Sequence, residues 1–375
     1  MMARKLRGSV PTLGDVSGMG RDRALIGRRP LLAGLGGAAL SAPFFIRARA
    51  AETLVVTAYG GEYQDVFMST VVRPFEKKFG VSVTYDLSGG AAQTYAKIRA
   101  ARGAPGFDVA AELTAPEAVL GAREKTLEPL TEREVPNLKY CWERSKAAIP
   151  PVGIVAYYQY MPLLWNTKHT DKPTSWADYW APSAKLKGRI LGHDPATNIL
   201  EIYALIMAAK LKGGGVDNMA PAWDLLREQK PALLATIQTS AQAAPYFEND
   251  QVWLTPYWSG RSGYYVSKGY PLDYTIPKEG TIGLPDVSAI PVRAANKKLA
   301  YEFLNFRLEP EVQRAFCLAY FASPARPDIT DWPAAFAESQ IVTEAQMAKL
   351  DLPDSAVLGA KRNEWVQRWQ EIMAS

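Results

Sequence analysis

Three short segments in the first third of the chain carry groups that could bind a polar ligand. They are Tyr59-Gly60-Gly61, Ser88-Gly89-Gly90 and Glu112-Leu113-Thr114, and each follows a run of residues that predicts a β-strand. A carboxylate can hold an ammonium group, an aromatic ring can lie against a cation, and glycine N–H groups can hold an anion. The pattern therefore indicates reversible binding of a small polar molecule.

Groups for covalent or metal chemistry are scarce. The chain has two cysteines, Cys141 and Cys317, and two histidines, His169 and His193, whose spacing fits neither a zinc site nor a Cys/His nucleophile pair. Serine-hydrolase, zinc-protease and phosphate-loop motifs are missing from the sequence. We expect no catalytic residue, metal or cofactor. The cysteines could form a disulfide in an oxidising compartment, but the apolar surroundings of Cys317 favour two buried thiols.

The order of the predicted elements places the three segments at one edge of a sheet. Apolar periodicity predicts alternating strands and helices, namely strands 54–59, 81–86 and 107–111 and helices 63–79, 92–101 and 116–122. Such βαβ units form parallel strands with right-handed crossovers. The carboxyl ends of the strands then meet the amino ends of the helices, where ligands bind in α/β folds.

A second α/β unit follows the proline-rich passage at 149–153. Its expected elements are strands 155–160, 163–166, 189–194, 252–260 (running into a helix) and 272–277, with helices 199–210 and 219–228. Helices 295–308 and 310–319 are expected after the chain has returned to the first unit. The chain passes repeatedly between two units, which favours a hinged pair of lobes. We assign residues 51–153 and 280–322 to lobe I, and residues 154–279 and 323–375 to lobe II.

The basic balance of the sequence belongs to its beginning. The net charge is +5, with 43 basic and 38 acidic residues. Nine of the basic residues but only two of the acidic ones lie in the first fifty positions, so removal of that segment would leave a net charge of about −2. Nucleic-acid binding thereby loses its main support.

Residues 1–50 have the parts of a cleavable export signal. A basic region ends in Arg28-Arg29, a glycine-containing apolar stretch covers 31–46, and Ala48-Arg49-Ala50 provides small residues for cleavage. The arginine pair is similar to a twin-arginine signal. The apolar stretch is shorter than the ~20 residues that a membrane span needs. We therefore expect cleavage after Ala50 or Ala51 and a periplasmic mature protein.

Several segments further along the chain resemble one known family in their order and spacing. They are PFEKKFG at 74–80, SWADYW at 175–180, PYF at 245–247, PKEG at 277–280 and SAIP at 288–291. With them the chain resembles the bacterial solute-binding proteins of ABC importers, most closely the spermidine/putrescine-binding group. The resemblance covers nearly the whole chain after residue 51. It implies an α/β, two-lobed periplasmic-binding-protein fold (type II), with hinged lobes and the ligand in the cleft.

The resemblance also implies ligand-binding positions. Asp194 falls where polyamine binders place a carboxylate for an ammonium group, and Trp258 looks like the tryptophan that lies along the methylene chain of the ligand. With the segments described first, the expected ligand-binding residues are Tyr59, Gly60, Gly61, Ser88, Gly89, Glu112, Thr114, Asp194, Thr197, Tyr257, Trp258, Asp286, Trp365 and Gln367.

Two acidic positions of the polyamine binders are replaced here. Thr197 stands where a second carboxylate is expected, and Ser259-Gly260-Arg261 follows Trp258 without an acidic residue. Each buried ammonium group needs an anionic partner, because an unpaired buried charge is costly. Asp194, Glu112 and Asp286 can supply that partner, and we expect Asp194 to be the principal one. The site is therefore less acidic than that of a spermidine binder.

These observations predict a non-enzymatic receptor that hands a small, amine-containing metabolite to the membrane permease of an ABC importer. We expect it to act as a monomer without nucleic acid. Alternatives on the same scaffold are an amino-acid derivative, another small organic acid or ferric iron. Iron is disfavoured because Tyr257-Trp258 occupies the place of the tyrosine pair in ferric-binding relatives, and tryptophan is no ligand for a hard metal. A periplasmic hydrolase or lyase is a further alternative, since two carboxylates suffice for glycoside hydrolysis.

Overall fold

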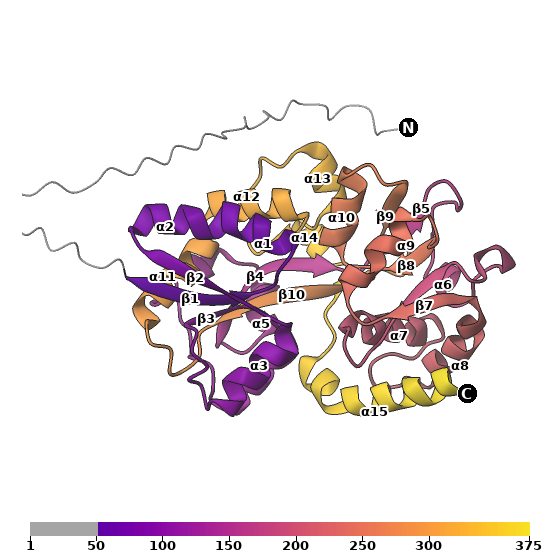
Figure 1. The fold of residues 1–375 in the computed structure, drawn as a ribbon, viewed down its shortest axis with the longest axis horizontal. Coiled ribbons are helices and arrows are strands. Elements are labelled where there is room, and N and C mark those ends of the chain that lie inside the picture. The colour runs from indigo at the N-terminus through magenta and orange to yellow at the C-terminus, as the bar shows by residue number, and fades with distance from the viewer. Residues whose placement is uncertain (1–51) are drawn as a thin grey trace, which may run out of the picture. The chain divides into compact units, whose positions relative to one another are not determined.

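The computed structural model describes residues 52–375 of the chain. The export signal expected at 1–50 lies outside these described residues. Between residues 52 and 375 the chain forms two β-sheets with helices packed around each of them (Figure 1). We call the part built on the larger sheet lobe I and the part built on the smaller sheet lobe II.

The sheet of lobe I has seven strands and a mixed topology. Its order is β11-β4-β10-β3-β1-β2, and β12 pairs with β10. The strands are β1 (Thr53–Ala58), β2 (Ser82–Leu87), β3 (Val109–Thr114), β4 (Gly153–Tyr160), β10 (Thr281–Ala289), β11 (Ser323–Pro324) and β12 (Leu350–Asp351). The first three strands are parallel, whereas β10 runs antiparallel to both β3 and β4.

Helices connect and cover the strands of lobe I. They are α1 (Glu62–Phe67), α2 (Arg73–Phe79), α3 (Ala91–Ala100), α4 (Ala115–Arg123), α5 (Glu143–Ala148), α11 (Lys297–Arg307), α12 (Pro310–Tyr320), α13 (Ala334–Ser339) and α14 (Glu344–Met347). A π-helical turn at Met68–Val72 joins α1 to α2, so the helix expected at 63–79 is continuous. Buried aromatic side chains of α1, α2, α11 and α12 form the core on one face of the sheet.

Lobe II is built on a five-stranded sheet. The strand order is β7-β6-β8-β5-β9, with β5 (Leu163–Asn166), β6 (Ile190–His193), β7 (Leu233–Ile237), β8 (Leu254–Pro256) and β9 (Leu272–Thr275). The helices of this lobe are α6 (Ala177–Trp180), α7 (Ile199–Leu211), α8 (Ala220–Gln229), α9 (Ala244–Glu248), α10 (Ser259–Ser267) and α15 (Ser355–Ala374). Nearly all of α7 is buried, which fits its predominantly apolar sequence.

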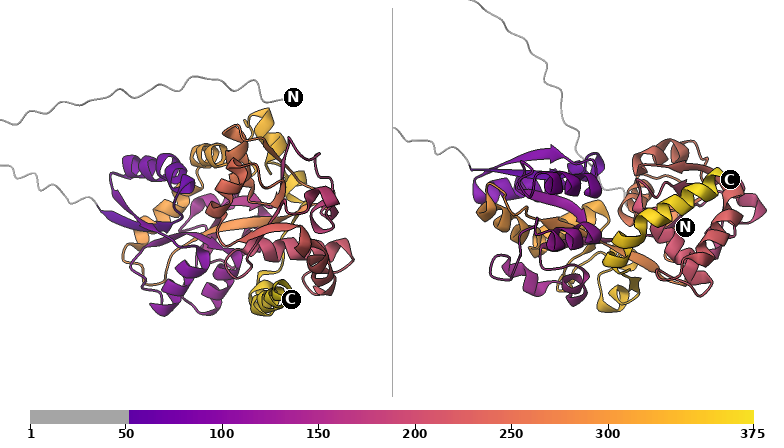
Figure 2. Two further views of the ribbon diagram at one scale, coloured as in Figure 1. Left: turned by 45° about the vertical axis from the view of Figure 1, so that its right-hand side comes forward. Right: turned by 90° about the horizontal axis from the view of Figure 1, so that it is seen from below.

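Three passages connect the lobes. The chain crosses between β4 and β5, between β9 and β10, and between β12 and α15. The first two passages lie together, because the N–H of Met161 donates to the carbonyl of Ile282 at 3.2 Å. Figure 2 shows α15 along the elements of lobe II, where Leu358, Trp365 and Trp369 join the core.

Two segments expected in lobe II belong to lobe I. Residues 154–160 form most of β4, whose eight residues are all buried and which pairs with β10 on one side and β11 on the other. Residues 323–351 supply β11, β12, α13 and α14, whose apolar side chains pack into the lobe I cores. The aromatic composition of 155–160 reflects burial on both sheet faces and not a change of domain. We therefore propose lobe boundaries at 160–163, 275–281 and 351–355.

The third strand also differs from its sequence expectation. It runs from Val109 to Thr114 and not from 107 to 111, because β10 pairs with its last residues, Leu113 and Thr114. Glu112 therefore lies inside a strand and not in a turn after it. Among residues 52–375, no helix has the length and apolar character to cross a membrane.

Candidate ligand-binding cleft

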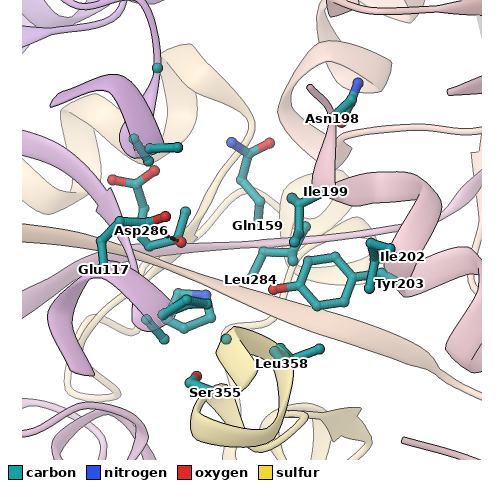
Figure 3. A pocket seen from close by; sticks show the side chains of 18 of the residues that line it. Glu117, Gln159, Asn198, Ile199, Ile202, Tyr203, Leu284, Asp286, Ser355 and Leu358 are labelled. Carbon is teal, nitrogen blue, oxygen red and sulfur yellow. Dashed lines mark hydrogen bonds between the residues drawn. The ribbon is translucent and has the colours of Figure 1, made fainter. Parts of the chain in front are cut away.

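A cavity of about 1260 Å³ lies between the two lobes. Its lobe I wall consists of the segments after β1, β2 and β3, together with part of β10. Its lobe II wall consists mainly of the amino-terminal parts of α7 and α10, and the first turns of α15 close a third side. Figure 3 shows Glu117 and Asp286 across the cavity from Asn198, Ile199 and Tyr203. The cavity is large enough for a metabolite and offers carboxyl, amide, hydroxyl and aromatic groups.

Glu117 lines the lobe I wall from the first turn of α4. Thr114 and Glu117 form a capping box, in which the Thr114 hydroxyl donates to Glu117 Oε2 and the Thr114 N–H lies 3.2 Å from the same oxygen. Glu117 is 7% exposed, and burial raises the pKa of its carboxyl above the ordinary value. Its carboxyl thus has a structural partner already, and it still faces the cavity.

Asp286 lines the same wall from the middle of β10. It is paired with Thr114 of β3 on one side and with Tyr157 of β4 on the other. The carboxyl is buried, and its Oδ1 atom has no hydrogen-bond partner among the described residues. Burial, and then the nearby charge of Glu112, hold the pKa of Asp286 well above its usual value. Such an unpaired buried oxygen is costly unless a ligand supplies a donor.

Glu112 lies behind the cavity wall and not in it. It is 1% exposed and accepts hydrogen bonds from the hydroxyls of Tyr63 and Tyr157, the latter at 2.9 Å. The guanidinium of Arg307 lies 3.6 Å from its Oε1 atom. Glu112 does not line the cavity. It therefore acts on the cavity through its charge beside Asp286.

Aromatic side chains contribute to both walls. Tyr59 and Tyr320 line the cavity from lobe I, and Trp258 and Tyr203 line it from lobe II. Burial is the main cause that raises the pKa of Tyr59 well above its ordinary value, and the charges of Asp286 and Glu112 add to it. The hydroxyl therefore stays protonated beside the carboxyl groups. Aromatic faces next to carboxylates suit an organic cation.

The lobe II wall carries no ionised group at the start of α7. The side-chain oxygen of Asn198 accepts from the N–H of Leu200 at 3.2 Å and so begins the helix. The Asn198 amide lies 3.1 Å from Nδ1 of His193. Burial lowers the pKa of His193 to about 4, so this ring is neutral at physiological pH. Beyond Asn198, the apolar side chains of Ile199 and Ile202 face the cavity.

Three arginines also reach the cavity, and each is engaged elsewhere. Arg144 donates to the carbonyls of Met347 and Leu350, at 2.6 and 3.0 Å. Arg362 lies within 3.5 Å of the carbonyls of Pro195 and Ala196. The positive charge of Arg362 lowers the pKa of Glu117, but this effect is smaller than those of burial and of the hydrogen bond from Thr114.

The third arginine, Arg261 on α10, pairs with Glu62 of α1 and so links the two lobes. Its side chain is 21% exposed and lies beside Tyr320 and Trp258 in the cavity lining.

Eight of the fourteen residues expected from the sequence line this cavity. They are Tyr59, Gly60, Ser88, Gly89, Thr114, Thr197, Trp258 and Asp286. The other six, Gly61, Glu112, Asp194, Tyr257, Trp365 and Gln367, do not line it. The three strand-end segments therefore do converge, as parallel strands require.

Asp194 was expected to be the principal anionic partner, but it is directed elsewhere. Its Oδ1 atom accepts the N–H of Ala196 at 2.9 Å, and its carbonyl accepts from Thr197 and Asn198. These bonds form a tight turn between β6 and α7, which commits the carboxylate to the backbone.

Three of the expected aromatic and polar residues serve packing or the surface. Tyr257 is fully buried in the second core of lobe II, and Trp365 joins the core beneath α15. Gln367 is exposed on α15 and lies 3.4 Å from Glu371.

Sequence reasoning missed Glu117, Gln159, Tyr203 and Arg261. The sequence Thr114-x-x-Glu117 before an apolar helix is a capping-box pattern, so a signal for Glu117 was available. The others lie inside regular elements, and only the tertiary fold shows that they face a cavity.

Cys141 and Cys317 are buried free thiols, as expected. Burial raises the pKa of Cys141 to about 12. Within residues 52–375, no group of three or more His, Cys, Asp or Glu side chains is arranged to hold a metal ion.

Two α/β lobes joined by three passages, with a polar and aromatic cavity between them, define a two-lobed ligand-binding protein. Comparison with known proteins makes the assignment specific. The chain belongs to the bacterial extracellular solute-binding protein family, whose family model matches residues 70–344.

Two of the named relatives are spermidine/putrescine-binding proteins. The chain is 32% identical over 141 residues to the spermidine/putrescine-binding periplasmic protein of Escherichia coli, an alignment that covers 38% of this chain and 39% of that protein. It is 26% identical over 289 residues to spermidine/putrescine-binding periplasmic protein 1 of Haemophilus influenzae, covering 72% of this chain and 77% of that protein.

A solved structure shows the same fold. The spermidine/putrescine ABC transporter substrate-binding protein of Streptococcus pneumoniae superposes with a TM-score of 0.71. The match covers 86% of this chain and 100% of that one, at 18% identity.

Proposed function

We propose that this chain is the exported ligand-binding component of an ABC importer, and that it binds a small metabolite through an ammonium group without converting it. Membership of the solute-binding family and the polyamine-binding names of its relatives support this proposal. A partner permease and a periplasmic location follow from the same reasoning. Mass spectrometry of the mature amino terminus, expected near residue 51, tests export.

The single observation that carries the ligand class is the state of Asp286. Its Oδ1 atom is buried at the cavity wall without a hydrogen-bond partner among residues 52–375. An ammonium group placed there gains a charge-assisted hydrogen bond and satisfies this oxygen, which a neutral or anionic ligand would not do equally well. Glu117 lies on the same wall and can add attraction for a second positive group.

The rest of the cavity fits an alkyl chain next to that ammonium group. Tyr59, Tyr203 and Trp258 offer aromatic faces, and Ile202 and Leu284 offer apolar surface. Burial of methylene groups against such surfaces is favourable by ~0.8 kcal/mol for each CH₂. The cavity thus combines charge recognition at one end with apolar contact along its length.

Binding measurements with matched ligands test the proposal. In titration calorimetry of the mature protein we expect putrescine or spermidine to bind, and 1,4-butanediol, which has the chain without the amines, to bind at least about tenfold more weakly. Equal affinity for the diol and the diamine would refute the ligand class. The ligand recovered after incubation should be chemically unchanged. Mass spectrometry of small molecules released from gently purified protein provides an independent identification.

A second candidate ligand is an amino-acid derivative that carries both charges. Arg261 favours it, because its guanidinium reaches the cavity beside Tyr320, and the charges of both Arg261 and Asp286 influence that ring. A carboxylate at Arg261 and an ammonium group at Asp286 would satisfy both. Comparing 4-aminobutanoate with putrescine, which share the chain length and differ in one terminal group, decides between the two.

A further inference from the structure

Two buried carboxyl groups, Asp286 and Glu112, lie beside each other on adjacent strands. Asp286 of β10 is opposite Thr114 of β3, and Glu112 is two residues before Thr114. Since strand side chains alternate between faces, both carboxyl groups point to the same face of the sheet. Asp286 is 7% exposed and Glu112 is 1% exposed. Two negative charges this close and this buried repel each other strongly.

Glu112 has the partners that compensate for a negative charge. Tyr63 and Tyr157 donate their hydroxyls to its two oxygens, and Arg307 completes an ion pair at 3.6 Å. Burial is the largest cause that raises the pKa values of both tyrosines, so they remain donors. Arg307 also donates to the carbonyl of Ala111 at 3.0 Å, which fixes it at Glu112.

Asp286 has fewer donors than Glu112, because Tyr157 gives its carboxyl a side-chain hydrogen bond while the Oδ1 atom has no partner among the described residues. The titratable and charged groups that face it come from every element around it, namely Glu112 (β3), Tyr157 (β4), Tyr59 (after β1), Tyr63 (α1), Tyr320 (α12) and Arg307 (α11), with Glu117 (α4) beyond Tyr59. Arg307 is the one cation of this set, and its charge is opposed by Glu112. A second negative charge at Asp286 would therefore be uncompensated while the cavity is empty.

We propose that Asp286 holds a proton while the cavity is empty and releases it when the ammonium group of the ligand binds, so that proton and ligand compete for one carboxylate. This proposal rests on the proposed function, because it takes the ligand to be an amine. The raised pKa of Asp286 agrees with the geometry, since burial and the charge of Glu112 both favour the protonated form.

The exchange is balanced without any co-reactant. The O–H bond of the Asp286 carboxyl breaks, its electron pair stays on the carboxylate, and the proton passes through water to the buffer. The ammonium group keeps all its own protons and forms an ion pair with the new carboxylate. At Asp286 the charge is thus the same before and after one ammonium group binds, and the second ammonium group of a diamine adds one positive charge to the cavity.

Proton exchange makes the affinity depend on pH with a fixed sign. Where Asp286 is protonated in the empty protein and ionised in the complex, the dissociation constant falls by up to about tenfold for each unit rise in pH. The dependence ends when the empty protein loses this proton or when the amine, with a pKa near ~10, loses its own. An acidified periplasm would therefore weaken ligand capture.

Titration calorimetry with putrescine in buffers of different ionisation enthalpy measures the exchange. At neutral pH we expect release approaching one proton for each putrescine bound. Asp286→Asn should abolish this release. Glu117→Gln is the matched control, because it removes the other cavity carboxyl and should leave the release in place. Binding of putrescine without proton release, or release that survives in Asp286→Asn, would overturn the proposal.

Infrared spectroscopy of the empty protein tests the starting state without any ligand. We expect a carboxylic-acid C=O band of Asp286 at neutral pH, beside that of Glu201, whose pKa is raised by burial to about 7. The Asp286 band should be missing from folded Asp286→Asn and present in Glu117→Gln. A spectrum in which Asp286→Asn removes no such band overturns the exchange. Should putrescine and spermidine both fail to bind while the band is present, the proposed function fails and the protonated Asp286 stands.

Discussion

Each lobe buries an acidic side chain close to the cleft, and the two carboxyl groups differ in their hydrogen bonds. In lobe II, Glu201 is 2% exposed, and its carboxyl accepts the N–H of His193 at 3.1 Å and the indole N–H of Trp369 at 3.3 Å. In lobe I, Asp286 is 7% exposed and leaves Oδ1 without a partner among the described residues. Glu201 does not line the cavity, whereas Asp286 does.

This comparison separates an acid with structural partners from the acid that we propose binds the ligand. Donors of the protein satisfy Glu201, so this residue ties the start of α7 to β6 and α15. The Oδ1 atom of Asp286 has no donor among the described residues, although the carboxyl also has side-chain hydrogen bonds with Tyr157 and Glu112, so a ligand can supply the missing donor. We therefore propose that lobe I recognises the positive charge of the ligand, whereas lobe II contributes aromatic and apolar surface, together with Arg261 and Arg362, that can cover the ligand when the lobes close.

The largest expected effect is that of Asp286→Asn. The variant keeps the shape of the side chain and removes the charge that faces the ammonium group. Loss of one partner of a buried charge pair costs ~2–5 kcal/mol, which is roughly thirtyfold or more in affinity for putrescine. Calorimetry at about pH 8, where protons compete less with the ligand for Asp286, should show the full loss of affinity. A loss below threefold would remove Asp286 as the anchor.

Trp258→Ala should have an intermediate effect. Trp258 lines the cavity from the lobe II side at the start of α10 and is only partly buried. Its ring offers contact to the alkyl chain and to the cation, worth ~1–2 kcal/mol, so we expect about tenfold weaker binding. Thermal unfolding should change little. An unchanged dissociation constant in the folded variant would show that lobe II contributes less than the comparison requires.

The first half of lobe I could be predicted from sequence because its contacts are local in order. Strands and helices alternate between residues 53 and 123, and each turn between them falls within a few residues of its expected place. The convergence of Tyr59, Ser88 and Thr114 on one cavity follows from parallel strands alone. No knowledge of side-chain contacts was needed.

β10 could not be predicted in the same way, although it carries Asp286. Gly283 and Pro285 interrupt its sequence, and both are unfavourable inside strands. What holds the strand is pairing with β3 and β4, whose residues are more than a hundred positions away. From the sequence, Asp286 came to attention only as one of three carboxylates that could pair with an ammonium group. Its unpaired oxygen became visible only in the folded structure.

Asp194 shows the opposite case, a residue whose position follows from the sequence and whose side-chain direction does not. It follows a strand at the expected edge, and Thr197 three residues later does line the cavity. The direction of the Asp194 side chain is set by its bond to the Ala196 N–H, which sequence position does not determine. Asp194→Asn should therefore weaken putrescine binding less than about threefold, measured beside Asp286→Asn. A loss as large as that of Asp286→Asn would mean that lobe II also recognises charge.

Glu201→Gln should have the smallest effect on binding and a distinct effect on stability. Burial raises the pKa of Glu201 to about 7 from 4.5. Between these values the folded protein binds more protons than the unfolded chain, so stability from this group falls as pH rises towards 7. His193, whose pKa is lowered to about 4 from 6.5, has the opposite sign and loses stability as pH falls. The variant removes the first dependence and keeps the second. The melting temperature of the variant minus that of wild type should therefore be larger at about pH 8 than at about pH 5, which calorimetric melting can measure.

Affinity of Glu201→Gln for putrescine should stay within about twofold of wild type, because Glu201 is satisfied by protein donors. A large loss of affinity with unchanged melting behaviour would mean that the structural and ligand-binding acids had been assigned to the wrong lobes.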